Sequence, residues 1–331
     1  MSSPARQALL LVNLGTPSAP DTQSVKTYLR EFLSDPQVVR LPRWLWWPIL
    51  HGIVLPHRAR RSAQNYAHVW MQEGSPLAVH TQRQAEELQK QLDQKQDCHL
   101  EVVWAMRYGE PALDQVLTRL CKAGYQTLFI LMLYPQSSFS TNDSVRAKVE
   151  HWRRQFPQPP DIDWLPPFYE HPAYIKALAA NIQRQRSQRP APVLIMSFHG
   201  IPRSDVARGD VYPAHCERTA CLLAQELGLR EDEWRLAYQS RFGWAPWLQP
   251  YTDDILKQLA VTGDAVDIVC PGFVSDCLET LEEIQIQYKA VWQDSGGGAY
   301  RYITALNECA EWTGALAQIV QQHTGGGDAG A

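Results

Sequence analysis

Short apolar runs alternate with longer amphipathic segments along most of this 331-residue chain, and this alternation permits few folds. The runs are rich in β-branched and aromatic residues and are bounded by Gly, Pro or polar residues, which is typical of buried strands. We expect strands at 8–14, 101–107, 127–133, 161–165, 193–198, 234–239, 265–270 and 300–305. Helical patterns lie around them, at 22–33, 76–94, 111–122, 140–155, 172–185, 213–227, 251–261, 276–293 and 309–322. Strand followed by helix, repeated, predicts parallel sheets with helices on both faces.

The length of the chain fits two domains of ordinary size. The stretch 181–192 is rich in Arg and Gln and contains two prolines, so it marks a compositional boundary. It divides the chain into two four-stranded α/β halves. The glycine-rich end, 324–331, is expected to be disordered.

Composition excludes several classes of protein. A formal charge of −4 creates no field for polyanions, so we expect no nucleic-acid partner. The seven cysteines are odd in number and form no CxxC pair, which favours a reduced, cytoplasmic protein. No apolar run approaches the ~18 residues of a membrane span, and the run at 8–12 is interpreted as a first strand and not a signal peptide.

The segment 41–61 carries three tryptophans and several aliphatic residues ahead of a basic stretch, with Pro48 and Pro56 interrupting it. It has two interpretations. It is either a loop and helix that cap the core, or an exposed apolar lip for a large flat ligand or a membrane surface.

Residues at the strand ends are informative because open α/β sheets bind ligands beyond the carboxyl ends of their strands. His199 ends the run VLIMSF and could act as a base or metal ligand, or as a structural hydrogen-bonding group. Arg107 and Tyr108 end the second strand. The hydroxyl-rich stretch 134–144 follows the third, and it predicts either a carboxylate cradle or a simple helix cap.

The stretch DCLETLEEIQIQY, 276–288, opens a helix with four acidic residues. Glu279 and Glu283 are four residues apart, so an α-helix would place both on one face. Such acids can be dipole partners on a solvated face. If the face borders the crevice, they form a file of oxygen ligands, and carboxylate together with His suits Fe, Mn or Zn.

Six segments together resemble the ferrochelatase family: LLVNLGTP, WAMRYGEP, LYPQSSFSTNDS, SFHGIP, YQSRFGWAPWLQPYTD and CPGFVSDCLETLEEI. The resemblance covers residues 8 to about 315. It implies two Rossmann-like domains, each a four-stranded parallel sheet flanked by helices, with the active-site cleft between them. The implied domains are 1–170, which includes the lip 41–61, and 171–323, whose last helix packs back on the first. The implied reaction is insertion of Fe(II) into protoporphyrin IX to form protohaem.

The resemblance also implies roles for single residues. His199 is the acceptor of pyrrole protons and a metal ligand, Glu279 is the glutamate opposite it and a second metal ligand, and Glu283 is the next acid of a metal or proton relay. The residues implied to line or support the porphyrin site are Leu14, Arg107, Tyr108, Ser138, Trp247 and Asp276.

Three positions depart from the pattern of the family. Relatives with a [2Fe-2S] cluster bind it through cysteines in the YPQ loop and near the carboxyl end, whereas this chain has Phe139 and only Cys309, so no cofactor is expected. Gln287 replaces the third acid of the relay, and Cys277 stands where some relatives have a second site histidine.

The expectations for partners follow from the same resemblance. We expect a cytoplasmic monomer that binds protoporphyrin IX and Fe(II), with peripheral association at the inner face of the membrane through 41–61. Two alternatives stay open: a chelatase for another tetrapyrrole such as coproporphyrin III, and a carrier of porphyrin or haem without catalysis.

Overall fold

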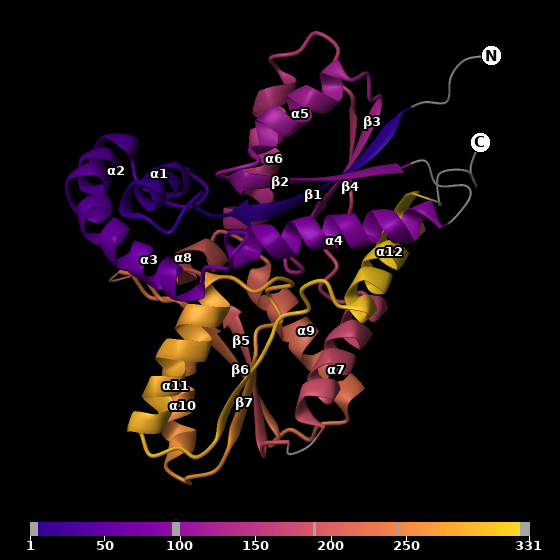
Figure 1. The fold of residues 1–331 in the computed structure, drawn as a ribbon. Coiled ribbons are helices and arrows are strands. Elements are labelled where there is room, and N and C mark those ends of the chain that lie inside the picture. The colour runs from indigo at the N-terminus through magenta and orange to yellow at the C-terminus, as the bar shows by residue number, and fades with distance from the viewer. Residues whose placement is uncertain (1–5, 95–99, 188–189, 244, 325–331) are drawn as a thin grey trace. The chain divides into compact units, whose positions relative to one another are not determined.

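The computed structural model describes residues 6–94, 100–187, 190–243 and 245–324. These residues group into two compact units, each built on one sheet (Figure 1). Unit 1 comprises Met1–Tyr134, Ser138–Pro167 and Val320–Ala331, and unit 2 comprises Pro135–Ser137 and Phe168–Ile319. The tail 324–331 was predicted to be disordered. Its first residue, Thr324, instead ends a helix, and 325–331 lie outside the described residues.

Unit 1 has a four-stranded parallel sheet in the order β2-β1-β3-β4. Its strands are β1 (Gln7–Gly15), β2 (Leu100–Tyr108), β3 (Thr127–Met132) and β4 (Asp161–Trp164). Its helices are α1 (Thr22–Leu33), α2 (Arg43–Ile49), the π-helix η1 (Leu50–Val54), α3 (Leu55–Val69), α4 (Pro76–Asp93), α5 (Leu113–Lys122), the π-helix η2 (Phe139–Asp143) and α6 (Ser144–Arg153).

Unit 2 repeats this topology in the order β6-β5-β7-β8, again with all strands parallel. Its strands are β5 (Val193–His199), β6 (Trp234–Gln239), β7 (Val266–Val269) and β8 (Tyr300–Ile303). Its helices are α7 (Pro172–Arg186), α8 (Arg203–Val206), α9 (Tyr212–Leu227), α10 (Thr252–Ala260), the π-helix η3 (Glu279–Tyr288) and α11 (Lys289–Asp294). The final helix, α12 (Ala310–Thr324), belongs to unit 2 up to Ile319.

All eight predicted strands are confirmed, and so is the fold of two helix-flanked parallel sheets. The strands were recognisable because the central strand of each sheet is buried on both faces. Residues 8–12 of β1 have no exposed surface, and residues 194–196 of β5 have none either. A strand buried on both faces must be a continuous apolar run, which is the pattern that the sequence displays.

Two predicted helices differ from their expected form. The segments expected to be α-helical at 140–155 and 276–293 contain the π-helices η2 and η3, which the amphipathic pattern did not distinguish from α-helix. The π-helix is rare, and where it occurs it is frequently found at functional sites. Both π-helices lie just after the third strand of their sheet.

The segment 41–61 forms α2, η1 and the first half of α3, and it combines the two interpretations of the sequence. Trp46 is only 8% exposed, and its indole N–H donates to the carbonyl of Leu33 at 2.7 Å. We define the lip face as the apolar side chains of this segment that remain exposed, which are Leu41, Trp44, Leu45, Trp47 and Ile53. The tryptophans of the segment are therefore divided between core and surface.

The prolines of this segment do not end its helices. Pro48 lies inside α2, and the π-helix η1 follows it directly. A proline removes an intrahelical hydrogen bond, and a local π-turn is one way to accommodate that loss. No helix among the residues that the structure describes is both long enough and apolar enough to cross a bilayer.

Candidate active site

The strand order of unit 2 places the predicted catalytic residues at one edge of one sheet. The chain leaves β5 toward β6 and leaves β7 toward β8, so the connections diverge between the neighbouring strands β5 and β7. Such a switch point opens a crevice at the carboxyl ends of the strands. His199 ends β5, and Glu279 lies in the segment that follows β7.

The imidazole of His199 is half-buried and held in one tautomer. Its Nδ1 lies 2.7 Å from the carbonyl oxygen of Gly200. A carbonyl oxygen can only accept, so Nδ1 carries the proton in this contact, and the neutral ring has its lone pair on Nε2. Nε2 has no hydrogen-bond partner among the described residues. His199 is thus arranged as a base.

Gly200 allows a close approach on the side of His199. A Cβ atom at this position would lie 2.9 Å from the carbonyl oxygen of Gln239 and 3.2 Å from the indole of Trp247. The ring of Trp247 lies with its centroid 6.4 Å from that of His199, and its Nε1 donates to the carbonyl of Phe242 at 2.7 Å. Trp247 therefore forms an ordered aromatic neighbour of the histidine.

Glu283 is held by four hydrogen bonds within unit 2. One carboxylate oxygen accepts from the backbone N–H of Ser240 at 2.9 Å and from the hydroxyl of Tyr288 at 3.1 Å. The other accepts from Nε2 of Gln239 at 3.3 Å and from the hydroxyl of Ser240. This carboxylate has a fixed orientation and a nearly complete set of donors.

The backbone of Ser240 creates much of this cradle. Its φ is +65°, in the left-handed region that residues other than glycine adopt at a cost. The turn follows β6 at once, and it directs both the N–H and the hydroxyl of Ser240 to the same carboxylate. Strain of this kind clusters at functional sites.

The π-helix η3 sets the spacing of its acidic side chains. Glu283 contacts Tyr288, and Glu282 accepts from Gln287 at 2.5 Å. Both contacts join residues five apart, the spacing of the π-helical hydrogen bond. Gln287, expected from α-helical spacing to follow Glu283 in a row, contacts Glu282 instead.

Asp276 is buried and organises the start of this helix. Its carboxylate accepts from the hydroxyls of Thr280 at 2.9 Å and Tyr302 at 2.6 Å, and from the side-chain amide of Asn307 at 2.7 Å. Burial raises the pKa of the neighbouring Cys277 thiol well above its usual range, and the Glu279 carboxylate raises it further, so the thiol stays neutral.

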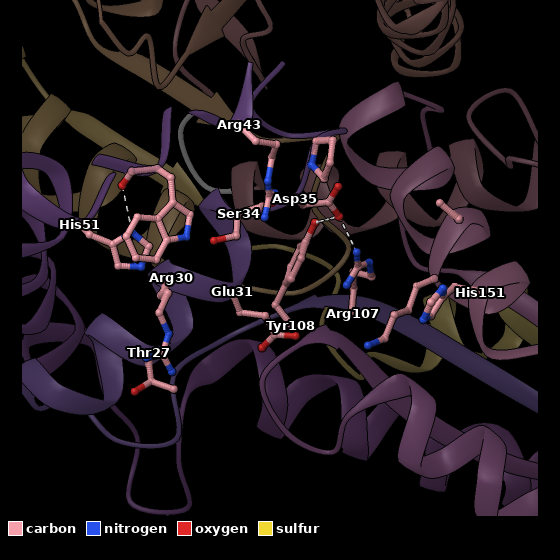
Figure 2. A pocket seen from close by; sticks show the side chains of 14 residues that line it. Thr27, Arg30, Glu31, Ser34, Asp35, Arg43, His51, Arg107, Tyr108 and His151 are labelled. Atoms are coloured by element: carbon pink, nitrogen blue, oxygen red, sulfur yellow. Dashed lines mark hydrogen bonds and ion pairs between the residues drawn. The ribbon is translucent and has the colours of Figure 1, made fainter. Parts of the chain in front are cut away.

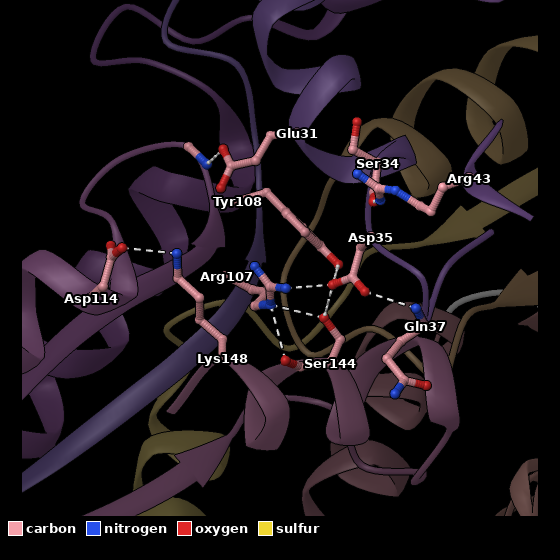
Figure 3. Close-up of polar contacts among 11 residues, drawn as sticks. Glu31, Ser34, Asp35, Gln37, Arg43, Arg107, Tyr108, Asp114, Ser144 and Lys148 are labelled. Carbon is pink, nitrogen blue, oxygen red and sulfur yellow. Dashed lines mark hydrogen bonds and ion pairs between the residues drawn. The ribbon is translucent and has the colours of Figure 1, made fainter. Parts of the chain in front are cut away.

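Unit 1 contains its own buried polar network at the end of β2. Figure 2 shows Arg107 and Tyr108 beside an open groove, and Figure 3 shows their contacts with Asp35. The guanidinium of Arg107 pairs with Asp35 and donates to the hydroxyl of Ser144 at 2.8 Å. Asp35 also accepts from the hydroxyls of Tyr108 at 2.8 Å and Ser144 at 2.6 Å. The cation predicted to line the porphyrin pocket thus already has an internal carboxylate partner.

The other two predicted porphyrin residues of unit 1 also lie after strands of the sheet. Leu14 is half-buried near the end of β1, and Gly15 beside it has a φ of +122°. A Cβ atom at Gly15 would overlap the carbonyl of Tyr108, so the glycine lets β1 and β2 stay paired to their ends. Ser138 is buried and forms the N-cap position of η2 after β3, with its hydroxyl 3.3 Å from that of Ser140.

Sequence reasoning missed the residues that hold these side chains. Asp35 reaches Arg107 across 72 positions, and Ser240 reaches Glu283 across 43, so no local spacing signals either contact. Ser240 directly follows the predicted strand 234–239, and its place at a strand end was the available clue. Within the described ranges, no cluster of three or more His, Cys, Asp or Glu side chains is arranged to hold a metal ion.

Comparison with known proteins identifies the family. The sequence model of the ferrochelatase family matches residues 6–324. The ferrochelatase of Aromatoleum aromaticum is 45% identical over 98% of this chain and 89% of its own length. The ferrochelatase of Chromobacterium violaceum is 44% identical over 97% and 89%, and that of Herminiimonas arsenicoxydans is 46% identical over 96% and 87%.

Solved structures agree on the fold. SirB from Bacillus subtilis with Fe3+ superposes with a TM-score of 0.56 at 13% identity, covering 97% of this chain and 98% of that protein. CbiX, the terminal enzyme of sirohaem biosynthesis in denitrifying bacteria, gives a TM-score of 0.52 at 13% identity over 95% and 98%. At this identity the likeness concerns the fold alone, whereas the full-length matches concern the family. The chain belongs to the ferrochelatase family and is a metal chelatase of haem biosynthesis.

Proposed function

We propose that this enzyme inserts Fe(II) into protoporphyrin IX and that His199 accepts a pyrrole proton during insertion. The observation that carries the proposal is the bond between Nδ1 of His199 and the Gly200 carbonyl, which leaves the lone pair on Nε2. A neutral imidazole with a free Nε2 is the form that can take a proton near neutral pH. Its place at the β5–β7 switch point is where ligands of such sheets bind.

The reaction requires the macrocycle to exchange two N–H protons for one divalent ion. The two N–H bonds break and two protons leave, so the macrocycle becomes a dianion. Its four nitrogens bind the divalent metal, and the metalloporphyrin core is neutral. A planar ring keeps its lone pairs in the ring plane, and a site that tilts one pyrrole exposes a lone pair to the metal at the expense of binding energy. His199 accepts the first proton, and Glu279 or water accepts the second.

The two glutamates are proposed to act in sequence. Glu279, which begins η3 and is partly exposed, is proposed to be the carboxylate that contacts the metal. Glu283 lies one turn further along and is proposed to be the next carboxylate of the relay. Because four donors occupy it, one of them must release the carboxylate when it receives a metal or a proton. Asp276 supports both by holding the start of the helix.

Replacing Glu283 with glutamine is expected to slow insertion about tenfold at limiting Fe(II), since losses of this order follow changes next to metal ligands. The amide removes a negative charge, and one of its ends is a donor that would oppose the donors of Ser240 and Tyr288. The measurement is the initial rate against Fe(II) concentration. Glu282→Gln is the matched control, because Glu282 is adjacent but accepts from Gln287. An iron dependence equal to that of the control would remove Glu283 from the relay.

The macrocycle contacts are proposed for Leu14, Tyr108 and Ser138 of unit 1 and for Trp247 of unit 2. Arg107 is proposed to act on the porphyrin indirectly, by supporting Tyr108, since its own charge is paired with Asp35. The apolar lip face supports protoporphyrin IX as substrate, because a more carboxylated tetrapyrrole gains less from apolar surface.

The substrate assignment is tested by kcat/KM for Fe(II) insertion into protoporphyrin IX and coproporphyrin III under identical anaerobic conditions. We expect a clear preference for protoporphyrin IX. A preference for coproporphyrin III would assign the enzyme to the other tetrapyrrole and overturn this part of the proposal.

The lip face is proposed to rest on a membrane surface. Trp44 is 79% exposed and Trp47 is 57% exposed, and both project from the same short helix. Tryptophan is favoured at the interface between lipid and water because its ring is apolar and its N–H is polar. The basic side chains of α3, among them Arg60 and Arg61, follow in the chain and would face anionic headgroups.

Replacing Trp44 and Trp47 together with serine is expected to weaken vesicle association at least about tenfold, because two large apolar groups no longer enter the interface. Co-sedimentation with phospholipid vesicles measures the effect. The control is Val261→Ser, which changes a side chain of unit 2 that is 83% exposed. If the double variant and the control sediment alike, the lip face does not bind membranes.

Three further expectations belong to this proposal. The described cysteines are all free thiols, which supports a reducing compartment such as the cytoplasm. Phe139 stands in the loop where cluster-binding relatives have a cysteine and packs against the guanidinium of Arg40, which supports an enzyme without an iron-sulfur cluster. A monomer stays a prediction from the family resemblance.

A further inference from the structure

An open groove of about 1140 Å³ lies within unit 1, between α1, α2 and α6 (Figure 2). Its size is sufficient for a ligand of several tens of atoms. Two residues of the proposed porphyrin site, Arg107 and Tyr108, also line this groove. Their side chains already form hydrogen bonds or ion pairs with Asp35 and Ser144. The remaining residues of the lining have no role in the proposed insertion chemistry.

The lining of this groove is positively charged. It contains the cations Arg30, Arg43, Arg107 and Lys148 and the carboxylates Glu31 and Asp35. Arg107 and Asp35 neutralise each other, and Lys148 pairs with Asp114 at 2.8 Å. Glu31 accepts from the backbone N–H of Gly109 at 3.0 Å. The carboxylate of Glu31 keeps its charge in that contact, so the groove retains two arginines, Arg30 and Arg43, that form no ion pair within the described ranges, together with the single carboxylate of Glu31.

These two arginines are held differently but border the same space. Arg43 donates to the backbone carbonyl of Ser34, which orients the guanidinium without neutralising it. The guanidinium of Arg30 forms no hydrogen bond or ion pair with any residue that the structure describes. Figure 2 shows Arg43 beside Ser34 and Asp35, whereas Arg30 lies below His51 and extends toward Thr27. A guanidinium presents paired donors that match the oxygens of a phosphate or carboxylate.

An aromatic wall and two imidazoles complete the groove. The ring of His51 stacks on Trp47 with centroids 4.0 Å apart, and its Nδ1 lies 3.0 Å from the Trp47 carbonyl, so its Nε2 is left for a ligand. His151 lies at the opposite side, near Arg107. Trp47 belongs to both the groove and the lip face, so the charged and apolar surfaces are continuous.

We propose that this groove is a binding site for a phosphate-bearing anion, held by Arg30 and Arg43, with its apolar portion against Trp47. Two guanidiniums without carboxylate partners match the charge of a phosphate, and the adjoining tryptophan matches an apolar substituent. The phosphate group is either that of an anionic phospholipid or that of a soluble phosphate. The site does not depend on the chelatase activity.

The test uses the full-length protein with two probes: inorganic pyrophosphate, by calorimetry, and vesicles of phosphatidylglycerol compared with vesicles of phosphatidylcholine, by co-sedimentation. Arg30→Gln is expected to weaken binding of at least one probe about tenfold or more, because a charge-assisted contact is lost. Lys26→Gln is the matched control, since Lys26 is an exposed cation on the same helix that does not line the groove. Arg43→Gln, on α2, provides a second variant with the same expected effect.

Arg30-dependent binding of phosphatidylglycerol vesicles would identify the lipid as the source, and Arg30-dependent binding of pyrophosphate alone would identify a soluble phosphate. Both results support the site. The proposed site would be overturned if neither probe showed saturable binding. It would also be overturned if the Arg30→Gln and Lys26→Gln variants bound the probes equally. Loss of binding to phosphatidylcholine vesicles in a Trp44→Ser variant reports on the lip face alone, because Trp44 does not line the groove, so the two proposals fail separately. Metal insertion by Arg30→Gln should equal that of the wild type.

Discussion

Replacing His199 with alanine is expected to lower the rate of metal insertion at least about 100-fold, the size of effect associated with a positioned general base. The variant removes the lone pair on Nε2, which is the group proposed to receive the pyrrole proton. Porphyrin binding should remain close to that of the wild type, because the imidazole offers only a small part of the contact surface. Stopped-flow insertion and porphyrin fluorescence titration measure the two quantities in the same preparation.

Chemical rescue separates catalysis from structure in this variant. Imidazole added to the His199→Ala enzyme is expected to restore part of the insertion rate, since a small base can enter the space that the side chain leaves. The backbone of Gly200 would keep its close packing against β6, so the fold should not change. Insertion at the wild-type rate without added imidazole would show that the proton goes elsewhere.

Replacing Asp35 with alanine is expected to reduce the free energy of unfolding by about 3–5 kcal/mol, the cost of breaking a buried ion pair by removing one partner. The side chain of Arg107 is only 11% exposed, so its charge would be left without compensation. The hydroxyls of Tyr108 and Ser144 would also lose their shared acceptor. Urea denaturation of both proteins measures the difference.

The control for Asp35 is Asp114→Ala, which breaks the partly exposed pair between Asp114 and Lys148. Exposed pairs contribute about 0–1 kcal/mol, so this variant should unfold close to the wild type. Equal losses in the two variants would show that the Asp35 network contributes no more than an ordinary surface pair.

The stability difference between wild type and Asp35→Ala should depend on pH. Burial alone would raise the pKa of Asp35, but hydrogen bonds from Ser144, the Gln37 backbone and Tyr108, together with the charge of Arg107, outweigh burial and lower it. The unfolded state therefore takes up the proton first as the pH falls. The contribution of Asp35 is complete above the ordinary carboxyl pKa of about 3.9 and declines below it, so the difference should narrow in acid.

The strands and the position of His199 could be predicted from the sequence because burial on both faces leaves a continuous apolar signature. The end of such a strand is also where an α/β sheet presents its functional groups. His199 and Glu279 lie in segments that follow neighbouring strands, and the strand-end rule found both without knowledge of strand order. Because β5 and β7 are paired and parallel, the two residues follow strand ends at the same edge of the unit 2 sheet.

The partners of the predicted residues could not be read from the sequence. Arg107 was predicted to line the porphyrin site, yet it forms an ion pair with Asp35, which lies in the loop between α1 and α2. Local patterns carry no information on such distant pairs. The same limit applied to the lip, where Trp46 and Trp47 are adjacent in sequence. The indole of Trp46 is buried and donates to the carbonyl of Leu33, whereas the ring of Trp47 is exposed.

The π-helix η3 is a different kind of miss, because α- and π-helices share an amphipathic pattern over a few turns. Spacing predicted that Gln287 follows Glu283 in one row. In the structure, Glu282 contacts Gln287 and Glu283 contacts Tyr288, both at a spacing of five.

The central claim is that this chain turns over a porphyrin and a ferrous ion, with His199 as the proton acceptor. The most direct test is anaerobic Fe(II) insertion into protoporphyrin IX in large excess over enzyme, followed by the loss of porphyrin fluorescence. The account predicts many turnovers per enzyme and formation of protohaem. Tight porphyrin binding with fluorescence loss limited to one equivalent of enzyme would contradict it, and would make His199 and Glu279 structural residues of a carrier.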